Sequence, residues 1–397
     1  MTRFQFRGDV PASKSFYNRA MIARSFFPEL ELKGTSDCDD VRVMQKAVAC
    51  MWAGETRIPC GEAGTVFRFM AFRVSRQKGD FLLTGSPRLL ARPQKEILRI
   101  LPQLGAKVES RPEGLWIRSA GWLPPRERLR IRADESSQFV SGLLLSAWNL
   151  PFNLEFEIEG ARVSNAYWEM TQRFLARIGL KVELRDGVHR VAGAQVPQLT
   201  VVSVEPDFSS AFPLAVAGSL WGETRLDGMG GASLQPDAIF PSLLESCGAA
   251  VVREGADLIF RAQGPLKGRT HHLLETPDLF PVLAVAAAFS EGESFLGGAP
   301  HLVAKESDRL AKTRELLSLA RIPCSVEGSG LRVQGQGPSC VPATFSFNPD
   351  QDHRMAMAAG LLKLKNQRIE IQTPDVVGKS YPGFWRDLGT GAGLRLP

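Results

Sequence analysis

A weak recurring unit constrains the fold of this chain more than any other feature of its sequence. Each copy has a strand that ends in glycine, a polar loop, an amphipathic helix, a second glycine and a short hairpin. In three copies the glycines are 20, 19 and 20 residues apart: Gly85 and Gly105, Gly160 and Gly179, Gly228 and Gly248. A fourth copy begins at Gly297. This spacing predicts an α/β chain of repeated supersecondary units, with the second glycine ending each of the first three helices in a left-handed conformation.

Polar or glycine-rich turns introduce further predicted helices. They are expected over 11–26, 64–74, 136–148, 207–220, 278–289 and 352–364, and the helix of the fourth copy over 305–319. Several of these turns carry Ser, Thr, Asp or Lys where a helix start exposes unpaired N–H groups, which suits anion binding. The glycine-rich run 389–393 instead predicts a frayed end.

Length and composition indicate a globular protein of more than one domain. A chain of 397 residues is too long for a single ordinary core, and 44% hydrophobic with 23% charged residues is typical of folded proteins. The longest apolar stretch, 280–289, is about half of a membrane span. The first residues lack the apolar core of a signal peptide, so we do not expect export.

Cysteine and charge content narrow the cellular context and the ligands. The six scattered cysteines form no metal-like cluster with the histidines and are expected to be reduced thiols in the cytoplasm. A net charge of +6 could indicate a nucleic-acid binder, but no nucleic-acid-binding motif accompanies it. Small anionic substrates explain the positive balance equally well.

Seven motifs concentrate residues that bind anions. They are Ser13-Lys14-Ser15 followed by Asn18-Arg19, Gly61 to Arg68, Leu83 to Pro93, Ser136 to Phe139, Lys305 to Arg309, Asp352 to Met357, and Gly378 to Pro382. Ser15 and Arg19 are four residues apart, so their side chains are expected to hold one anion from a single helix face. Lys305 and Arg309 are also four residues apart, so they are expected to lie on the same face of a helix.

These motifs, in this order, resemble the 5-enolpyruvylshikimate-3-phosphate synthase family over essentially the whole chain, from Lys14 to Lys379. The resemblance implies an α/β (α+β) enolpyruvyl transferase fold of two domains. Each domain would contain three βαβαββ units arranged as an inside-out α/β barrel. The first domain would span 11–205, and the second 1–10 plus 206–397. The active site would lie in the cleft between them.

The resemblance also implies the reaction. The enolpyruvyl group of phosphoenolpyruvate would pass to the 5-hydroxyl of shikimate 3-phosphate by addition and elimination, with release of phosphate, on the route to chorismate and the aromatic amino acids. The implied reaction requires no metal and no organic cofactor. From the sequence itself we expect no nucleic-acid or membrane partner, and a monomer.

By resemblance, the catalytic residues would be Lys14, Asp278 and Glu306. Asp278 would take the hydroxyl proton, and Glu306 would serve the methylene carbon. Shikimate 3-phosphate would contact Lys14, Ser15, Arg19, Ser136, Ser137, Gln138, Ser164, Asp278, His301 and Lys305. Phosphoenolpyruvate would contact Lys14, Gly64, Arg92, Gln138, Arg309, Arg354 and Lys379.

A few positions depart from the family pattern, and two of them leave alternatives open. His301 replaces a phosphate-binding asparagine; it either contacts the phosphate or is a hydrogen-bonded histidine at the cleft edge. Glu62 replaces an asparagine of the glycine-rich loop; it either turns away from the ligand or pairs with Arg68 or Arg92. Two other functions compete: a related transferase that uses UDP-N-acetylglucosamine, and an inactive anion-binding relative with a regulatory role.

Overall fold

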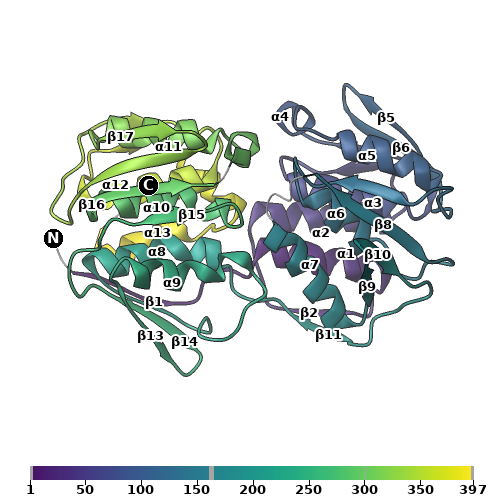
Figure 1. The fold of residues 1–397 in the computed structure, drawn as a ribbon, viewed down its shortest axis with the longest axis horizontal. Coiled ribbons are helices and arrows are strands. Elements are labelled where there is room, and N and C mark those ends of the chain that lie inside the picture. The colour runs from purple at the N-terminus through teal and green to yellow at the C-terminus, as the bar shows by residue number, and fades with distance from the viewer. Residues whose placement is uncertain (1–2, 161–164, 299, 395–397) are drawn as a thin grey trace. The chain divides into compact units, whose positions relative to one another are not determined.

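The computed structural model describes residues 3–160, 165–298 and 300–394, and it divides the chain into two compact units (Figure 1). We call Ala12–Glu205 the inserted unit, because it interrupts the other one. The split unit consists of Met1–Pro11 and Pro206–Pro397. Paired backbones mark both chain crossings: Ser13 N–H donates to the carbonyl of Glu205 (2.7 Å), and Asp207 N–H donates to that of Pro11 (2.9 Å).

The inserted unit contains two four-stranded sheets of the same topology. In the first, β3 (Arg57–Pro59), β4 (Lys78–Thr84), β5 (Lys107–Arg111) and β6 (Gly114–Ala120) take the order β3-β4-β6-β5. In the second, β7 (Leu129–Arg132), β8 (Leu154–Glu159), β9 (Val182–Arg185) and β10 (Val188–Val191) take the order β7-β8-β10-β9. Each has a parallel first pair and an antiparallel hairpin, the pattern of a βαβαββ unit.

The split unit repeats this arrangement. β1 (Phe4–Gly8), β12 (Gly222–Leu226), β13 (Ala250–Glu254) and β14 (Asp257–Arg261) form one sheet. β15 (Thr270–His272), β16 (Glu291–Gly297), β17 (Cys324–Glu327) and β18 (Gly330–Gln336) form the other. β1 pairs in parallel with β12, Phe4 opposite Gly222, although the whole inserted unit separates them in the chain.

The third repeat of each unit is shorter than predicted. It contributes a two-stranded parallel sheet, β2 (Glu31–Lys33) with β11 (Val201–Ser203) in the inserted unit and β19 (Ser346–Phe347) with β20 (Glu370–Ile371) in the split unit. Among the described residues no hairpin extends these two sheets. The predicted α/β class is confirmed, with two complete βαβαββ units and one reduced unit in each half.

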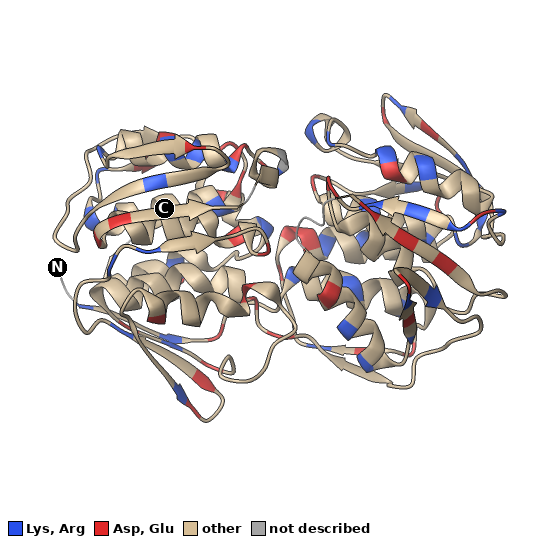
Figure 2. Ribbon diagram, viewed as in Figure 1, with Lys and Arg blue, Asp and Glu red and all other residues tan. Residues whose placement is uncertain are grey.

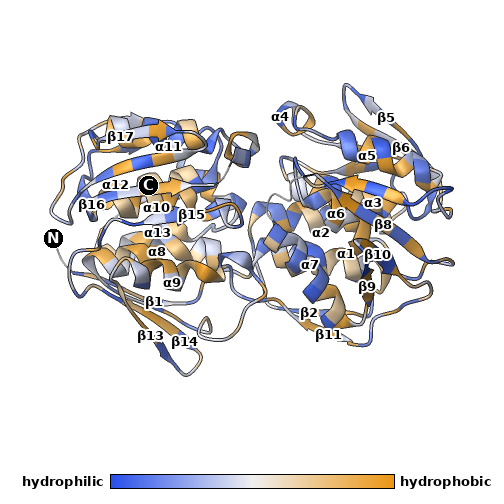
Figure 3. Cartoon of the chain, in the orientation of Figure 1, coloured by the Kyte–Doolittle hydropathy of each residue, from blue (hydrophilic) through white to orange (hydrophobic). Residues whose placement is uncertain are grey.

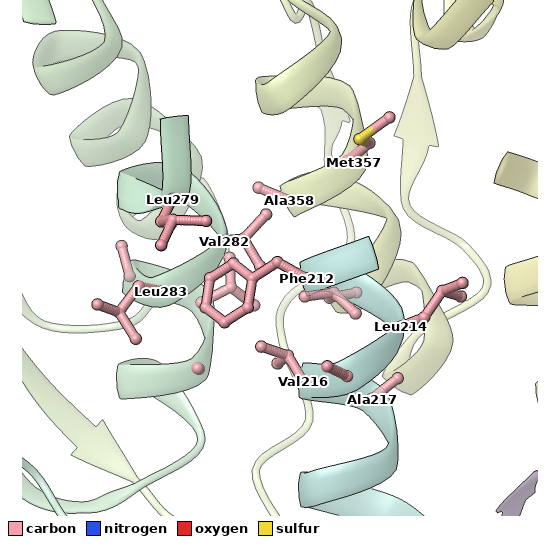
Figure 4. Packing of buried hydrophobic residues seen from close by; sticks show 14 of the residues in the cluster. Phe212, Leu214, Val216, Ala217, Leu279, Val282, Leu283, Met357 and Ala358 are labelled. Carbon is pink, nitrogen blue, oxygen red and sulfur yellow. The ribbon is translucent and has the colours of Figure 1, made fainter. Parts of the chain in front are cut away.

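Three inner helices form the core of each unit. They are α1 (Lys14–Phe26), α3 (Gly64–Val74) and α6 (Gln138–Leu145) in the inserted unit, and α8 (Phe208–Trp221), α10 (Phe280–Ala288) and α12 (His353–Lys365) in the split unit. α8 and α10 carry no charged residue (Figure 2), and Figure 3 colours each residue of the two helices by its hydropathy. In Figure 4, Phe212 of α8 points toward Val282 and Leu283 of α10, with Met357 of α12 above it.

The remaining helices are α2 (Asp39–Trp52), α4 (Pro87–Leu90), α5 (Lys95–Ile100) and α7 (Asn165–Ile178), then α9 (Phe240–Ser246), α11 (Arg309–Leu319) and α13 (Phe384–Ala392). Most of them pack against the inner helices, as α2 does against α1 and α7 against α6. α2 and α7 alternate buried and exposed positions as one-sided helices do. None of the helices in the described ranges has the length and apolar character needed to cross a membrane.

Backbone conformation confirms the glycine prediction and corrects two others. Gly105, Gly179 and Gly248 have φ of +88°, +113° and +97°. The predicted helix start at residue 305 is wrong: α11 begins at Arg309, because Asp308 accepts a hydrogen bond from Ala311 N–H and caps it. The predicted frayed end at 389–393 is also wrong, since most of that run forms the last turn of α13.

Candidate active site

Lys14 begins α1 in the inserted unit and already faces a carboxylate. Ser13 caps the helix by accepting a hydrogen bond from Phe16 N–H (3.4 Å). The Lys14 ammonium lies 3.1 Å from Asp40 Oδ2 in the first turn of α2. Only 11% of the Lys14 side chain and 15% of the Asp40 side chain are exposed. The predicted catalytic lysine is therefore held in place by a partner that the sequence motifs did not single out.

Arg19 is buried and ties α1 to α7. Its guanidinium donates to the carbonyls of Ser15 (2.7 Å) and Tyr167 (3.2 Å) and to Thr171 Oγ1 (2.8 Å). Burial lowers the pKa of Arg19 to about 10, so it keeps its charge at neutral pH. Ser15 thus meets Arg19 through its backbone carbonyl, whereas the sequence predicted that the Ser15 hydroxyl would act beside the guanidinium. Ser164, another predicted ligand, lies outside the described residues.

Gly64 and Arg92 lie against each other at the start of α3. A Cβ atom on Gly64 would come within 2.6 Å of Arg92 Nη1, so a larger residue here would displace the guanidinium from this position. Helix starts attract anions, and the arginine adds a full positive charge at this one. Glu62, in the same loop, is exposed.

Arg68, on α3, organises the predicted serine and glutamine ligands. Its Nη1 donates to Ser136 Oγ (3.0 Å) and to Gln138 Oε1 (2.9 Å), and Gln138 Nε2 donates to Thr65 Oγ1 (3.0 Å). Ser137 is buried and precedes the first residue of α6. Arg68 and Thr65 were absent from the predicted ligand set, although both belong to the glycine-rich motif that suggested it.

In the split unit, Arg309 joins three carboxylates. Its side chain is 1% exposed, and it contacts Asp352 through Nε (2.8 Å), Asp278 through Nη1 (2.6 Å) and Glu306 through Nη2 (2.9 Å). Asp352 is fully buried, caps α12 and accepts a further hydrogen bond from Ser307 Oγ (3.0 Å). The two predicted proton-transfer groups are thus neighbours of one arginine. Asp352 was not predicted as a site residue, although it lies two positions before Arg354 in the same motif.

Asp278 stays ionised in this surrounding. Burial alone would raise the pKa of its carboxyl, but the positive charges of Arg309, Lys305 and Arg354 outweigh that effect and hold the pKa below its usual range. Arg354, in the first turn of α12, lies with Nη2 3.9 Å from Asp278 Oδ2 and donates to Ser209 Oγ at the start of α8. Asp278 is therefore deprotonated at neutral pH, as a group that accepts a proton must be at the start of the reaction, although its low pKa makes it a weak base.

The other predicted residues of the split unit lie on short turns. His301 is buried on the 3₁₀ turn Pro300–Ala304, where burial and the charge of Lys305 lower its pKa to about 4. It is therefore neutral at pH 7 and adds no positive charge. Lys305 is half-buried in the segment before α11 and so does not share a helix with Arg309. Lys379 ends the turn Pro374–Lys379, and its ammonium donates to the carbonyl of Gln351 (3.2 Å).

Comparison with known proteins identifies the family. A family model described as EPSP synthase (3-phosphoshikimate 1-carboxyvinyltransferase) matches residues 33–388. The chain is 33% identical over 409 residues to a 3-phosphoshikimate 1-carboxyvinyltransferase of Methanoculleus marisnigri, covering 96% of this chain and 95% of the relative. It is 34% identical over 334 residues to the corresponding protein of Methanocorpusculum labreanum, covering 84% and 78%. The chain belongs to the EPSP synthase family.

Solved structures confirm the fold of this family member. An EPSP synthase from Acinetobacter baumannii superposes with a TM-score of 0.77 at 23% identity, over 99% of this chain and 96% of that one. The enolpyruvyl transferase NikO from Streptomyces tendae superposes with a TM-score of 0.72 at 16% identity, over 97% and 94%. The two-domain enolpyruvyl transferase fold is confirmed. So is the predicted activity that defines EPSP synthases, enolpyruvyl transfer from phosphoenolpyruvate to shikimate 3-phosphate.

Proposed function

We propose that the site residues described above in the inserted unit and in the split unit act on the same two substrates, phosphoenolpyruvate and shikimate 3-phosphate. Both substrates are multiply anionic, so bringing them together requires fixed cations that offset their repulsion. Lys14, Arg92, Arg309, Arg354 and Lys379 supply positive charge for phosphoenolpyruvate. Arginine suits its planar carboxylate and its phosphate because a guanidinium can pair through two N–H groups at once.

Shikimate 3-phosphate is proposed to contact a second set of residues, which shares Lys14 with the first. Hydroxyl and amide groups at the start of α6 are already oriented by Arg68, which supports their role as ligands. His301, being neutral, would contribute a hydrogen bond and no charge. The full proposed set is Lys14, Ser15, Arg19, Ser136, Ser137, Gln138, Ser164, Asp278, His301 and Lys305.

The reaction proceeds by addition and elimination. A proton reaches the methylene carbon of phosphoenolpyruvate, which makes C2 electrophilic, and the 5-hydroxyl oxygen forms a bond to C2 while Asp278 takes the hydroxyl proton. The bond from C2 to the phosphate oxygen then breaks, phosphate leaves, and the methyl carbon loses a proton to restore the double bond. We assign the proton transfers at this carbon to Glu306, with Lys14 contacting the reacting group.

The observation that best supports this assignment is the shared arginine. Arg309 contacts both Asp278 and Glu306, so the two carboxylates are fixed relative to each other before any substrate binds. An acid and a base held at defined positions avoid the entropic cost of assembling them during the reaction.

The free cysteines support a reducing compartment, and we propose a cytoplasmic monomer.

Phosphate release tests the proposal. It should require both phosphoenolpyruvate and shikimate 3-phosphate, should persist with EDTA, and should not occur with UDP-N-acetylglucosamine as the acceptor. Asp278→Ala and Glu306→Ala should each lower kcat by about 10²-fold or more, and Lys14→Met should abolish turnover. Glu315→Ala, a carboxylate on the same helix as Arg309 that pairs with Lys312, is the matched control and should keep parental kcat. A carboxylate variant with normal kcat and only a raised KM would refute its role in proton transfer.

A further inference from the structure

Asp40 is a shielded carboxylate to which the family motifs assign no role. It lies in the first turn of α2, and α1 and α2 pack against each other. Its Oδ2 is 3.1 Å from the Lys14 ammonium, although the two residues are 26 positions apart in the chain. The ion pair therefore forms through tertiary packing of two helix starts.

General stabilisation does not explain this contact. Most of both side chains is shielded, and removing two charges from water costs free energy that their attraction repays only in part, so stability is a weak reason for such a pair. An acidic residue in the first turn also stabilises a helix through the macrodipole. Asp39 meets that need one position earlier, where it is exposed to solvent. The macrodipole thus accounts for acidic residues at this helix start, but not for a carboxylate directed at Lys14.

The negative charge that faces Lys14 from α2 comes from Asp40. Cys38, the N-cap of α2, also interacts electrostatically with Lys14 and is a buried thiol. Burial raises the pKa of the Cys38 thiol above its ordinary value, so it stays neutral at pH 7.

A carboxylate at this distance fixes the direction of the ammonium. A lysine side chain is long and flexible, and its ammonium has three N–H donors in a tetrahedral arrangement. Once one donor is directed to Asp40, the directions of the other two are set by the Lys14 side chain. A reacting group held within a narrow range of positions is a recognised source of rate enhancement, and misplacement by about 1 Å can cost about 10²-fold.

We infer that Asp40 is a positioning residue, which holds the Lys14 ammonium in the orientation needed for enolpyruvyl transfer. The inference rests on the role proposed above for Lys14. It adds Asp40 to the functional residues of the inserted unit, as a group that acts through Lys14 without touching substrate. Because the contact between Asp40 and Lys14 depends on the packing of α1 against α2, a change in that packing would also change kcat.

The test compares two neighbouring substitutions in the full chain. Asp40→Asn keeps the size of the side chain but removes its charge, and kcat should fall by about 10- to 100-fold. The dissociation constant for shikimate 3-phosphate, measured by calorimetric titration, should change by less than about threefold, since most of its proposed ligands are untouched. Asp39→Asn, which makes the same charge change in the same helix turn, should retain parental kcat. Asp40→Glu restores the charge from a slightly displaced position, so its kcat should lie between those of Asp40→Asn and the parent.

Other outcomes would overturn the inference in distinguishable ways. Parental kcat in a folded Asp40→Asn variant, or equal losses in Asp39→Asn and Asp40→Asn, would show that the carboxylate has no special role. If Asp40→Asn does not fold, Asp40→Glu carries the test alone, and parental kcat there would contradict the inference. If Lys14→Met kept parental kcat, the role proposed for Lys14 would fail, and that of Asp40 with it. An inactive Lys14→Met beside a fully active Asp40→Asn would overturn only the role of Asp40.

Discussion

At the scale of single residues, the motifs predicted which side chains carry charge but not how the protein neutralises those charges. Arg309 was predicted as a ligand from its place in a motif, and the structure shows it buried among Asp352, Asp278 and Glu306. A buried guanidinium requires acceptors for its donors, which the sequence does not specify because they come from distant segments. Asp40 and Asp352 escaped prediction for that reason.

Gly64→Ala tests the contact between the start of α3 and Arg92. The new Cβ would lie 2.6 Å from Nη1 and 3.1 Å from Cζ, so the guanidinium must move. Losing one charge-assisted hydrogen bond, about 1.5 kcal/mol, should raise KM for phosphoenolpyruvate by about tenfold. Alanine should not weaken the helix itself. Steady-state kinetics beside Gly231→Ala, where a Cβ meets open space, provide the comparison. An unchanged KM in Gly64→Ala would argue against Arg92 as a ligand.

His301→Asn tests the buried imidazole. Burial and Lys305 lower its folded pKa to about 4, below the ordinary value of 6.5, so the unfolded chain binds the proton more readily. Stability should therefore be complete above pH 6.5 and decline toward pH 4, by up to about 2 kcal/mol at pH 5. Urea unfolding at pH 7 and pH 5 should show a smaller loss in His301→Asn than in the parent. Asp278, Lys305 and Arg309 act in both proteins, so identical losses would mean that the imidazole is not the responsible group.

At the scale of secondary structure, the repeat was predictable where it depends on local backbone conformation. Gly105, Gly179 and Gly248 could be predicted because each follows the helix of its repeat at a left-handed position, which favours glycine. In the fourth copy the left-handed position after the helix is occupied by Arg321, with φ of +60°, so no glycine marks the end of that helix in the sequence. The glycine run near the C-terminus was misjudged for the opposite reason. A Cβ on Gly391 would come within 2.6 Å of the Phe4 ring, so that glycine is required by tertiary packing.

Arg321→Gly should stabilise the protein. A left-handed conformation costs a non-glycine residue about 1–2 kcal/mol, and the greater freedom of glycine in the unfolded chain offsets part of the gain. The net effect should be an increase of up to about 1 kcal/mol in the free energy of unfolding, measured with urea. Gly248→Ala, the reverse change at the equivalent position of the third repeat, should destabilise the protein by a similar amount. A loss of stability in Arg321→Gly would show that contacts of the arginine side chain outweigh its strained backbone.

At the scale of the whole molecule, β1 precedes the inserted unit in the chain, whereas the other strands of the split unit follow it. β1 pairs with β12 along its whole length, and the buried Phe4 packs beside Gly391 of α13. Residues 206–397 made as a separate chain should therefore lack one sheet edge and part of their core. We expect this fragment to unfold at lower urea than the same fragment mixed with a peptide of residues 3–11. A scrambled peptide is the control, and an equal effect of both peptides would contradict the expectation.

The late partner of β1 has a consequence for synthesis on the ribosome. β1 is translated before the inserted unit, but its partner β12 begins only at Gly222. At the usual 5–20 residues per second, roughly 10 to 40 s pass before that partner emerges. The inserted unit is translated entirely within this delay, and its two ends meet through Ser13 and Glu205, so it can fold first. Newly made chains thus pass through a stage in which the inserted unit is complete and β1 is still unpaired. On crowded polysomes, the unpaired β1 strands of neighbouring chains would be exposed to each other.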